Sequence, residues 1–256
     1  MLVVLAACSA PAPVAGGGAT VDHVVDGDTF DVAEGRVRII GMNAPEAGEC
    51  FHDEAATELG RLLDAGPVLL VQDSSDRDRD GRLLRYVEVD GRDVGVELVR
   101  GGFAVVRVSE PDTARREQLD AAQEAARSDG AGLWAPDACG PAVTAAVEVV
   151  DVHADAAGPD DQNLDDEWVE LANSGADPVD IGGWILRDES SSHRFSFPPG
   201  FVLAAGAHVR IRSGCGQDTG SDLHWCESGS AVWNNDGDTA FLQDPNGNVA
   251  STFSYG

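Results

Sequence analysis

The chain contains no lysine, so all 17 of its Lys+Arg residues are arginines, set against 45 aspartates and glutamates. The formal net charge of -28 is far larger than solubility requires. Such a surface repels itself, and it repels nucleic acid, unless counterions screen it closely, as happens at roughly molar salt. The imbalance therefore predicts adaptation to a saline habitat. An acidic secreted protein from a high-GC genome, which favours arginine codons, is the alternative.

A long apolar run is also missing at the start of the chain, where the apolar stretch is too short to span a bilayer and no basic residue precedes it. Its end, Leu5-Ala-Ala-Cys8, resembles a lipobox, and a loose Pro/Gly/Ala segment follows to Gly18. We expect residues 1–19 to be a lipoprotein signal remnant and linker, with Cys8 lipidated. This predicts an extracellular or cell-surface protein held at the membrane by a lipid anchor. A remnant of an ordinary signal peptide is the alternative.

Cysteine is scarce, and the five present include no C-x-x-C pair, which argues against a zinc site. The six histidines likewise lack metal-ligand spacing. The four cysteines after Cys8 form an even set in a chain that starts like an exported protein, which favours disulfides. We expect Cys50 to pair with Cys139 and Cys215 with Cys226, and free buried thiols are the alternative.

Residues 20–140 alternate strand-like runs with helical patterns, and these are expected to form the first folded domain. Its strands are predicted at 20–25, 29–32, 36–40, 67–71 and 83–89, between turns rich in glycine, proline or aspartate. Its helices are predicted at 53–63, 94–100 and 112–127. Five strands interleaved with three helices predict a small closed β-barrel of the OB type, in the α+β class.

The pattern changes near Pro141, which we take as a domain boundary. Residues 141–256 carry about seven short strand-like runs spaced by Gly, Asp, Asn and Pro, without a convincing helical period. These runs are at 147–152, 167–171, 183–186, 194–197, 208–211, 239–243 and 251–255. This predicts an all-β, immunoglobulin-like sandwich and makes the chain multidomain.

Three residues at strand ends of the first domain are able to hold a hard divalent cation. Asp28 follows Gly27, which can take a backbone conformation that other residues rarely adopt. Asn43 offers an amide oxygen, and Ala44, held extended by the proline after it, presents its carbonyl oxygen. Water and substrate oxygens would complete the coordination that Ca²⁺ prefers. The sequence therefore predicts an exposed and weak calcium site at Asp28, Asn43 and Ala44.

Two arginines and a glutamate are suited to act on a phosphate next to that site. Arg38 lies on a predicted strand and Arg82 follows a predicted turn, and two planar guanidinium groups can grip the oxygens of one phosphate. Glu46 is the carboxylate that the metal does not need, so it is free to align or deprotonate the attacking water. Arg79, in the same turn as Arg82, is expected to contact the substrate as well.

Residues 20–139 resemble the staphylococcal nuclease (thermonuclease-like) family. The resemblance rests on motifs in the order and at the spacing of that family, namely Asp26-Gly-Asp-Thr29, Arg38-Ile-Ile-Gly-Met-Asn-Ala-Pro-Glu46 and Asp78-Arg-Asp-Gly-Arg-Leu-Leu84. It implies a Ca²⁺-dependent nuclease on an OB barrel that hydrolyses DNA and RNA to 3′-phosphate products. It also implies that Asp28 is a calcium ligand, that Arg38 and Arg82 bind phosphate, and that Glu46 is the base.

The sequence departs from that family at three places. Ala44 replaces a threonine, at a position where only the backbone carbonyl would be needed. Asn43 stands where the best-known member has a second calcium carboxylate, which removes a negative charge. Val108 and Glu110 stand where that member has tyrosines that flank the nucleotide. A catalytically inactive nucleic-acid-binding or scaffold protein on the same barrel is therefore the alternative function. Retention of Arg38 and Glu46 together with Arg82 favours the enzyme, which we expect to be a monomer.

Residues 147–256 resemble the lamin-tail domain of exported prokaryotic proteins. The matching segments are Asn163-Leu-Asp-Asp-Glu-Trp-Val-Glu-Leu171, Val179-Asp-Ile-Gly-Gly-Trp184, Phe197-Pro-Pro-Gly200 and residues 232–242. The resemblance implies an immunoglobulin-like attachment or binding module whose partner the sequence does not identify.

Two groups of side chains in that module allow alternative interpretations. Trp168 and Trp184 are expected to fill the sandwich core, and an exposed aromatic binding patch is the alternative. Asp165, Asp166 and Glu167 are expected to form a solvated acidic loop, and a cation site is the alternative.

Overall fold

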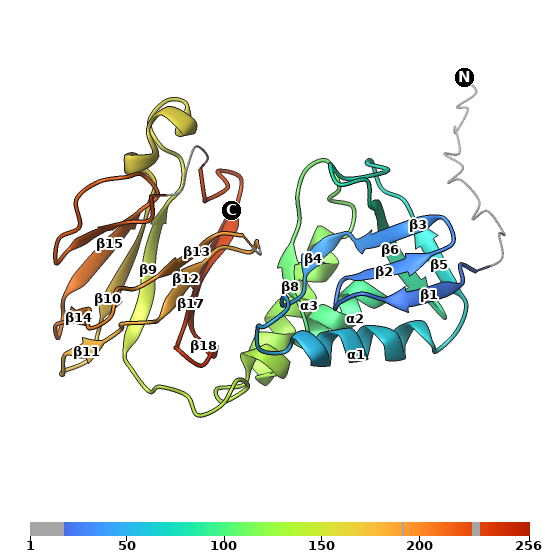
Figure 1. Ribbon diagram of the computed structural model, residues 1–256, viewed down its shortest axis with the longest axis horizontal. Coiled ribbons are helices and arrows are strands. Elements are labelled where there is room, and N and C mark those ends of the chain that lie inside the picture. The colour runs from blue at the N-terminus through green and yellow to red at the C-terminus, as the bar shows by residue number, and fades with distance from the viewer. Residues whose placement is uncertain (1–17, 191, 227–230) are drawn as a thin grey trace, which may run out of the picture.

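The computed structural model describes residues 18–190, 192–226 and 231–256, which form two domains that lie side by side (Figure 1). The predicted lipidation of Cys8 and most of the expected signal remnant fall outside these residues. No helix within the described ranges is long and apolar enough to cross a membrane.

The first domain holds the three predicted helices and all five predicted strands, together with three short strands that were not predicted. The strands are β1 (Val21–Val24), β2 (Thr29–Val32), β3 (Gly35–Ile39), β4 (Gly41–Asn43), β5 (Val68–Val71), β6 (Leu83–Val89), β7 (Arg92–Asp93) and β8 (Val105–Arg107). The helices are α1 (His52–Leu63), α2 (Val94–Arg100) and α3 (Arg116–Asp129), and a 3₁₀ turn follows at Gly132–Trp134.

Five strands of this domain close into a barrel. β1, β2 and β3 form an antiparallel meander, β3 pairs in parallel with β6, and β6 pairs antiparallel with β5. An antiparallel bridge between Ala19, just before β1, and Val68 in β5 completes the ring. Closure of five strands in this order confirms the predicted OB fold.

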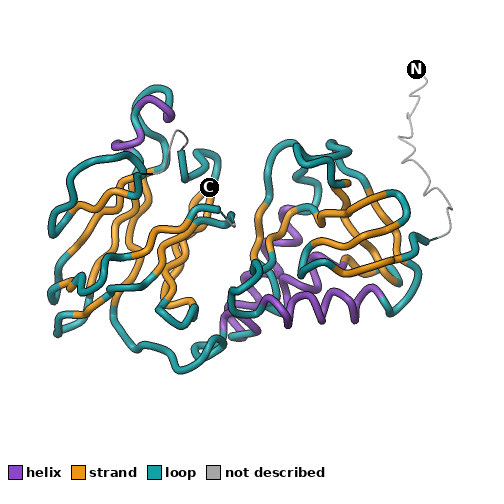
Figure 2. The backbone as a smooth tube through the Cα atoms, viewed as in Figure 1, coloured by secondary structure: helices purple, strands orange, loops and turns teal. Residues whose placement is uncertain are grey.

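The helices pack along one side of the barrel (Figure 2). Each is amphipathic enough to bury one apolar stripe, which α1 does with Ala55, Leu59 and Leu63. α2 buries Leu98 and Val99 in the same core. The barrel and its helices therefore share one hydrophobic core.

The third helix begins at Arg116 and not near residue 112 as predicted. The carboxylate of Asp112 accepts a hydrogen bond from the backbone N–H of Ser75 at 2.7 Å, and the N–H of Asp112 donates to the carbonyl of Ser109. These contacts hold residues 109–115 in turns, so the helical pattern starts one turn later than the composition suggests.

The second domain is built from strands and two 3₁₀ turns. The strands are β9 (Val147–His153), β10 (Trp168–Asn173), β11 (Val179–Asp180), β12 (Ile185–Arg187), β13 (Arg194–Ser196), β14 (Val202–Leu203), β15 (His208–Arg212), β16 (Asp222–His224), β17 (Asp238–Gln243) and β18 (Val249–Tyr255). The 3₁₀ turns lie at Asp160–Gln162 and Leu164–Asp166. The three short strands β11, β14 and β16 were not predicted.

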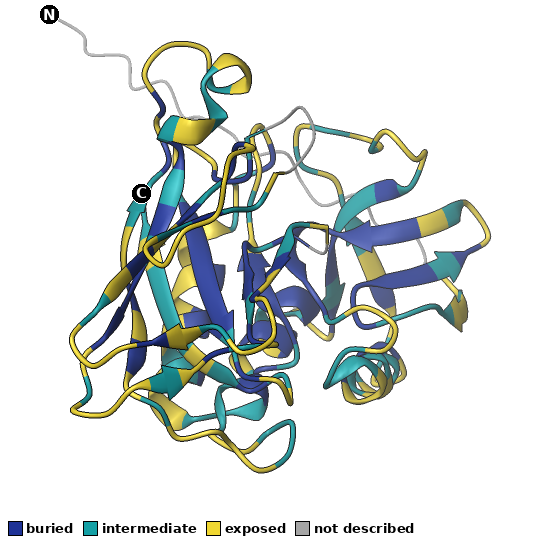
Figure 3. Cartoon of the chain, turned by 60° about the vertical axis from the view of Figure 1, so that its left-hand side comes forward, coloured by how far each residue is buried: buried dark blue, intermediate teal, exposed yellow. Residues whose placement is uncertain are grey.

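Two four-stranded sheets of this domain face each other, in the orders β16-β15-β10-β9 and β13-β12-β17-β18. Their inward-facing apolar side chains form a second core that includes Val169, Leu171 and Leu186. Figure 3 shows the buried residues gathered in the strands of both domains. This arrangement confirms the predicted immunoglobulin-like class.

The two tryptophans expected in that core take different places. Trp184 is 1% exposed and belongs to the core. Trp168 is only half-buried, stacks on the ring of His153 and lies under the guanidinium of Arg210 at 4.3 Å. The prediction for Trp168 is wrong because it alternates along β10 with Val169, whose side chain takes the inward position.

The prediction of a solvated acidic loop at Asp165, Asp166 and Glu167 is wrong for Glu167, which is fully buried. Its Oε1 accepts hydrogen bonds from the N–H groups of Val232 at 2.8 Å and Trp233 at 3.3 Å, and from the hydroxyl of Ser213. Burial raises the pKa of Glu167, and these hydrogen bonds counter part of that effect. Glu167 therefore ties two loops of the sandwich together.

Both expected disulfides are present. Cys50 is bonded to Cys139 across 89 residues of sequence, and Cys215 is bonded to Cys226 across 11. The first bridge fastens the loop before α1 to the segment that leads into the second domain.

Buried polar side chains of the second domain hold the connecting segment. Asn248 accepts a hydrogen bond from the N–H of Cys139 at 2.8 Å and donates to the carbonyl of Gly140 at 3.2 Å. Asp244 accepts from the N–H of Val143 at 2.9 Å. Because Asn248 and Asp244 are almost fully buried, these bonds are shielded from water and fix how the domains dock.

Candidate functional site

Asp28 is held at the turn between β1 and β2, where Gly27 precedes it. A Cβ atom on Gly27 would lie 2.5 Å from the Cβ of Ala55 in α1 and 2.7 Å from the Cβ of Ala44. Gly27 is not among the described glycines with positive φ, so its expected role in backbone conformation is wrong. The position needs glycine because the helix and the loop after β4 approach the turn closely.

The structure brings Asp28, Arg38, Asn43 and Ala44 into one cluster. The Oδ2 of Asp28 accepts a hydrogen bond from the N–H of Ala44 at 2.9 Å and lies 3.0 Å from the Nη1 of Arg38. The Nη2 of Arg38 donates to the Oδ1 of Asn43 at 2.8 Å. The Oδ1 of Asp28 accepts from the hydroxyl of Thr29 at 2.8 Å.

This cluster is buried, so the expectation of an exposed site is wrong. Asp28, Asn43 and Ala44 are between 3% and 7% exposed. The reason is the close packing of α1 and the loop after β4 against the Asp26–Asp28 turn. Burial, followed by the charge of Asp28, raises the pKa of Asp26 next to the cluster.

Arg38 occupies the position where the oxygens of Asp28 and Asn43 converge. The carboxylate of Asp28 and the amide oxygen of Asn43 both contact the Arg38 guanidinium. The two oxygens therefore face one position that suits a cation. Carboxylate, amide and carbonyl oxygens are the donors that Ca²⁺ takes, so the donor set fits this ion chemically. The described residues contain no group of three or more His, Cys, Asp or Glu side chains able to hold a metal. An ion here would depend on Asn43, the Ala44 carbonyl and water.

A cavity of about 400 Å³ adjoins this cluster, and arginines line it from three elements. Arg38 enters from β3, Arg79 and Arg82 from the loop between β5 and β6, and Arg107 from β8. The structure thus gathers the three arginines that the sequence assigns to substrate. Arg107 was missed because β8 was not predicted, and its place after the apolar pair Val105-Val106 was the available signal.

Arg82 is held in place by the turn that carries it. Its Nε donates to the Oδ2 of Asp78 at 2.6 Å, and its Nη2 lies 3.7 Å from the Oδ2 of Asp80. Burial alone would raise the pKa of Asp78, but the bonds from Arg82 outweigh it and hold that pKa below the usual value. The Arg82 side chain is 34% exposed, so it remains accessible to a ligand in the cavity.

Glu46 is not brought into this cluster. It is exposed in the loop after β4 and does not line the arginine cavity. Its backbone N–H donates to the Oε2 of Glu49 at 2.9 Å. Glu49 is in turn paired with Arg194 of the second domain, so the loop that carries Glu46 is held from both domains.

Two family models match the chain. Residues 36–136 match the staphylococcal nuclease homologue family, and residues 141–256 match the Lamin Tail Domain.

Curated relatives match the first domain. Endonuclease YncB of Bacillus subtilis (strain 168) is 34% identical over 127 residues, which cover 45% of this chain and 60% of the relative. Protein ParB of Escherichia coli is 32% identical over 132 residues, 44% of this chain and 70% of the relative. Thermonuclease of Staphylococcus hyicus is 28% identical over 124 residues, 44% of this chain and 73% of the relative. The chain spans less than two thirds of the length of YncB.

Proposed function

The chain belongs to the staphylococcal nuclease homologue family through its first domain and carries a lamin tail domain after it, and on this premise we propose that it hydrolyses phosphodiester bonds of nucleic acid. The names of two relatives, an endonuclease and a thermonuclease, support the reaction class. We include both DNA and RNA as substrates and 3′-phosphate ends as products.

The observation that carries this proposal is the cavity lined by Arg38, Arg79 and Arg82. In a protein of net charge -28, this concave site brings four arginines together with three aspartates, and its guanidinium groups can donate to a phosphate that enters it. Arg82 is pre-positioned by Asp78, so it loses little freedom when it donates to a phosphate oxygen. The guanidinium groups of Arg38 and Arg82 can then stabilise the charge that develops on the phosphate.

We propose Ca²⁺ as the cofactor. Asp28, Asn43 and the carbonyl of Ala44 would hold it, and when bound it would supply further positive charge beside the phosphate. Arg38 contacts the side-chain oxygens of Asp28 and Asn43, and it also donates to the carbonyls of Ile39 and Met42.

Glu46 is proposed as the group that accepts a proton from the attacking water. Its exposure leaves the carboxylate free to reach a bound substrate. The contact of its N–H with Glu49 fixes the loop position without engaging its side chain.

Digestion of plasmid DNA and of RNA, with calcium or chelator and over a range of NaCl concentrations, tests the proposal. Calcium-dependent cleavage that Glu46→Gln abolishes would support it. Cleavage unchanged in Glu46→Gln would remove Glu46 from the mechanism. Nucleic acid bound without any cleavage would favour the second candidate, an inactive binding or scaffold protein, which the loss of a carboxylate at Asn43 supports.

We also propose export to the cell surface with a lipid on Cys8. The two disulfides support an oxidising compartment, because such bonds rarely persist in the cytosol. Detergent-phase partitioning of the protein from the native host, compared with a Cys8→Ser variant, tests the anchor. Equal partitioning of both forms would rule it out.

A further inference from the structure

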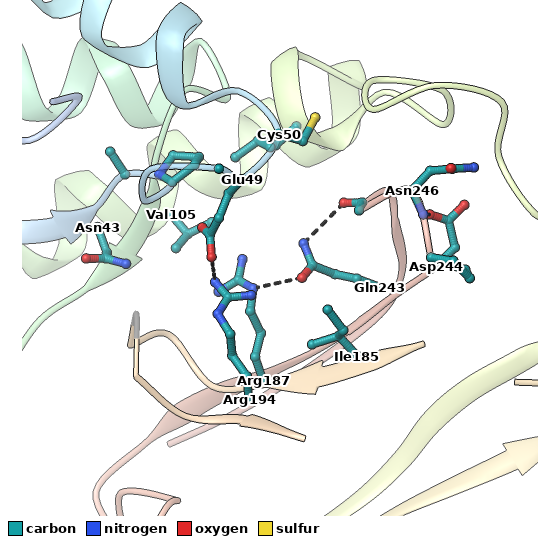
Figure 4. Close-up of a pocket in the computed structure, with 16 residues that line it drawn as sticks. Asn43, Glu49, Cys50, Val105, Ile185, Arg187, Arg194, Gln243, Asp244 and Asn246 are labelled. Atoms are coloured by element: carbon teal, nitrogen blue, oxygen red, sulfur yellow. Dashed lines mark hydrogen bonds and ion pairs between the residues drawn. The ribbon is translucent and has the colours of Figure 1, made fainter. Parts of the chain in front are cut away.

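A second cavity, of about 220 Å³, lies between the two domains, and two of the three candidate calcium ligands line it. Asn43, Ala44 and Glu49 line it from the first domain. Arg187 and Arg194 line it from strands β12 and β13 of the second domain, and Figure 4 shows these two side chains pointing toward Glu49. The cavity is smaller than most pockets for drug-sized ligands, and its size suits a phosphate group.

Arg187 is a buried cation that forms no direct ion pair in the part of the chain that the structure describes. It is 7% exposed, its Nη1 donates to the backbone carbonyl of Asp188 at 2.9 Å, and its Nε donates to the Oε1 of Gln243 at 3.3 Å. Its guanidinium lies 4.3 Å from the centre of the Phe241 ring. Within the described residues, no ion pair and no hydrogen bond engages its Nη2.

Burial and a neighbouring cation make the positive charge of Arg187 less favourable. Arg194 is next to it, and burial together with the charge of Arg194 lowers the pKa of Arg187 to about 10. The charges of Glu49, Asp188 and Glu189 act in the opposite direction, and Glu49 is already paired with Arg194. A buried charge is normally paired. Glu49 and Asp244 also line this cavity, but within the described residues neither forms an ion pair with Arg187, so its guanidinium can still donate to a bound anion.

We propose that this cavity binds a phosphate of the nucleic acid backbone, neighbouring the one that is cleaved, with Arg187 as its main ligand. The proposal rests on the proposed function and names a residue of the lamin tail domain as part of the substrate site. Asn43 and Ala44 border both the calcium cluster and the cavity, so a strand bound at the first is adjacent to the second. Planar guanidinium groups are the preferred protein ligands of phosphate.

Binding is tested on the full chain without turnover. A fluorescent single-stranded DNA 12-mer is titrated with protein in chelator at fixed ionic strength, and inorganic phosphate is titrated separately by calorimetry. Arg187→Gln is expected to weaken both by about tenfold or more, since it removes a charge-assisted contact. Arg210→Gln is the matched control, because Arg210 lies on the other sheet and pairs with Glu170 at 2.6 Å.

Arg187→Lys covers the case in which Arg187→Gln does not fold. It keeps the charge and loses the planar fork, so it is expected to bind the 12-mer at an intermediate affinity. Thermal unfolding of each variant, with phosphate and with chloride at equal ionic strength, reports folding and binding together. Phosphate should raise the unfolding temperature of the wild type and of Arg210→Gln, and raise it less in both Arg187 variants.

Kinetics then separate this site from the catalytic one. On a dinucleotide with one phosphodiester, Arg187→Gln should leave KM unchanged, whereas on the 12-mer it should raise KM with little change in kcat. Equal binding and equal KM in Arg187→Gln and Arg210→Gln would overturn the proposal. Phosphate binding that requires Arg187 but that the 12-mer does not compete for would also overturn it, and would indicate a site for free phosphate.

The proposed function fails independently of this site. If no substrate is cleaved while the 12-mer still binds through Arg187, the phosphate site stands and the hydrolase is rejected. If cleavage is normal and binding does not depend on Arg187, the hydrolase stands and this inference is rejected.

Discussion

Arg38 has more contacts than a simple phosphate clamp requires. Its guanidinium joins the carboxylate of Asp28 to the amide of Asn43 and donates to two backbone carbonyls. It is therefore also part of the structure that positions the candidate calcium ligands. The partners of Arg82 all lie in its own turn, so its substitution tests phosphate binding without disturbing the candidate calcium ligands.

Arg82→Ala is expected to reduce kcat/KM on DNA by two to three orders of magnitude, about 3 kcal/mol of transition-state stabilisation, as for other pre-organised charge stabilisers. Steady-state assays at saturating calcium measure it. Arg92→Ala, at an exposed position of strand β7, is the control and should retain normal turnover. Near-normal turnover of Arg82→Ala would show that Arg82 does not stabilise the transition state.

Asn43→Asp is expected to bind calcium about tenfold more tightly, since it restores a second carboxylate to the cluster. Isothermal calorimetry at fixed salt measures the change. Asn235→Asp alters the net charge equally at an exposed position of the second domain and serves as the control. Equal affinities of the two variants would exclude Asn43 as a ligand.

Residue types and motif order were enough to predict that Asp28, Arg38, Asn43 and Ala44 meet. They were not enough for the burial of the cluster, which follows from the packing of α1 against the Gly27 turn. Arg107 was also not predicted as part of the site. Its strand, β8, has only three residues and leaves almost no periodic signal in the sequence.

At the scale of elements, the turn between β1 and β2 depends on a glycine with no room for a side chain. Gly27→Ala is expected to destabilise the protein by about 1–3 kcal/mol, because its Cβ would overlap Ala55 and Ala44. Denaturant unfolding measures this change.

Gly60→Ala in α1 is the matched control for that experiment. The nearest atom to its Cβ would be 3.9 Å away, and alanine favours a helix interior, so stabilisation by about 0.5–1 kcal/mol is expected. If both variants lose the same stability, close packing is not what requires glycine at position 27.

Longer elements were predicted well because their periodic patterns agree with their tertiary environment. β2, β6 and α2 match the expected ranges, whereas six strands of two or three residues were missed, namely β4, β7, β8, β11, β14 and β16. The start of α3 was displaced because the contact between Asp112 and Ser75 overrides local helix propensity.

The way in which the two domains dock was not predictable from the sequence. Contacts such as Arg194 with Glu49 join residues far apart in the chain, and no local pattern identifies such partners. The acidic composition is a property of the same scale, and it predicts retention of activity at salt concentrations that screen long-range fields.

Two carboxyl groups, Glu189 and Asp238, line the cavity of about 830 Å³ between α3 and strands β17 and β18, and we expect them to make stability depend on pH. Burial raises the pKa of Glu189 to about 8, with further contributions from Asp238 and Asp188. Burial raises the pKa of Asp238 to about 6. The folded state therefore keeps these protons to a higher pH than the unfolded chain does. The free energy of unfolding should fall as pH rises from an ordinary carboxyl pKa to about 8.

Glu189→Gln is expected to flatten this dependence, since the amide stays neutral. Urea unfolding at intervals between about pH 5 and about pH 8.5 measures the slope. Glu34→Gln, in the exposed turn between β2 and β3, is the control and should keep the wild-type slope. An unchanged slope in Glu189→Gln would assign the dependence to other groups.

The bond between Cys50 and Cys139 encloses most of the first domain in one covalent ring. A protease that nicks the backbone once between these two residues therefore releases no fragment. Non-reducing electrophoresis would show a single intact species, and only added thiol would separate the two pieces. In an environment rich in extracellular proteases, such a ring allows a cut chain to keep its amino-terminal strands attached to the rest of the barrel.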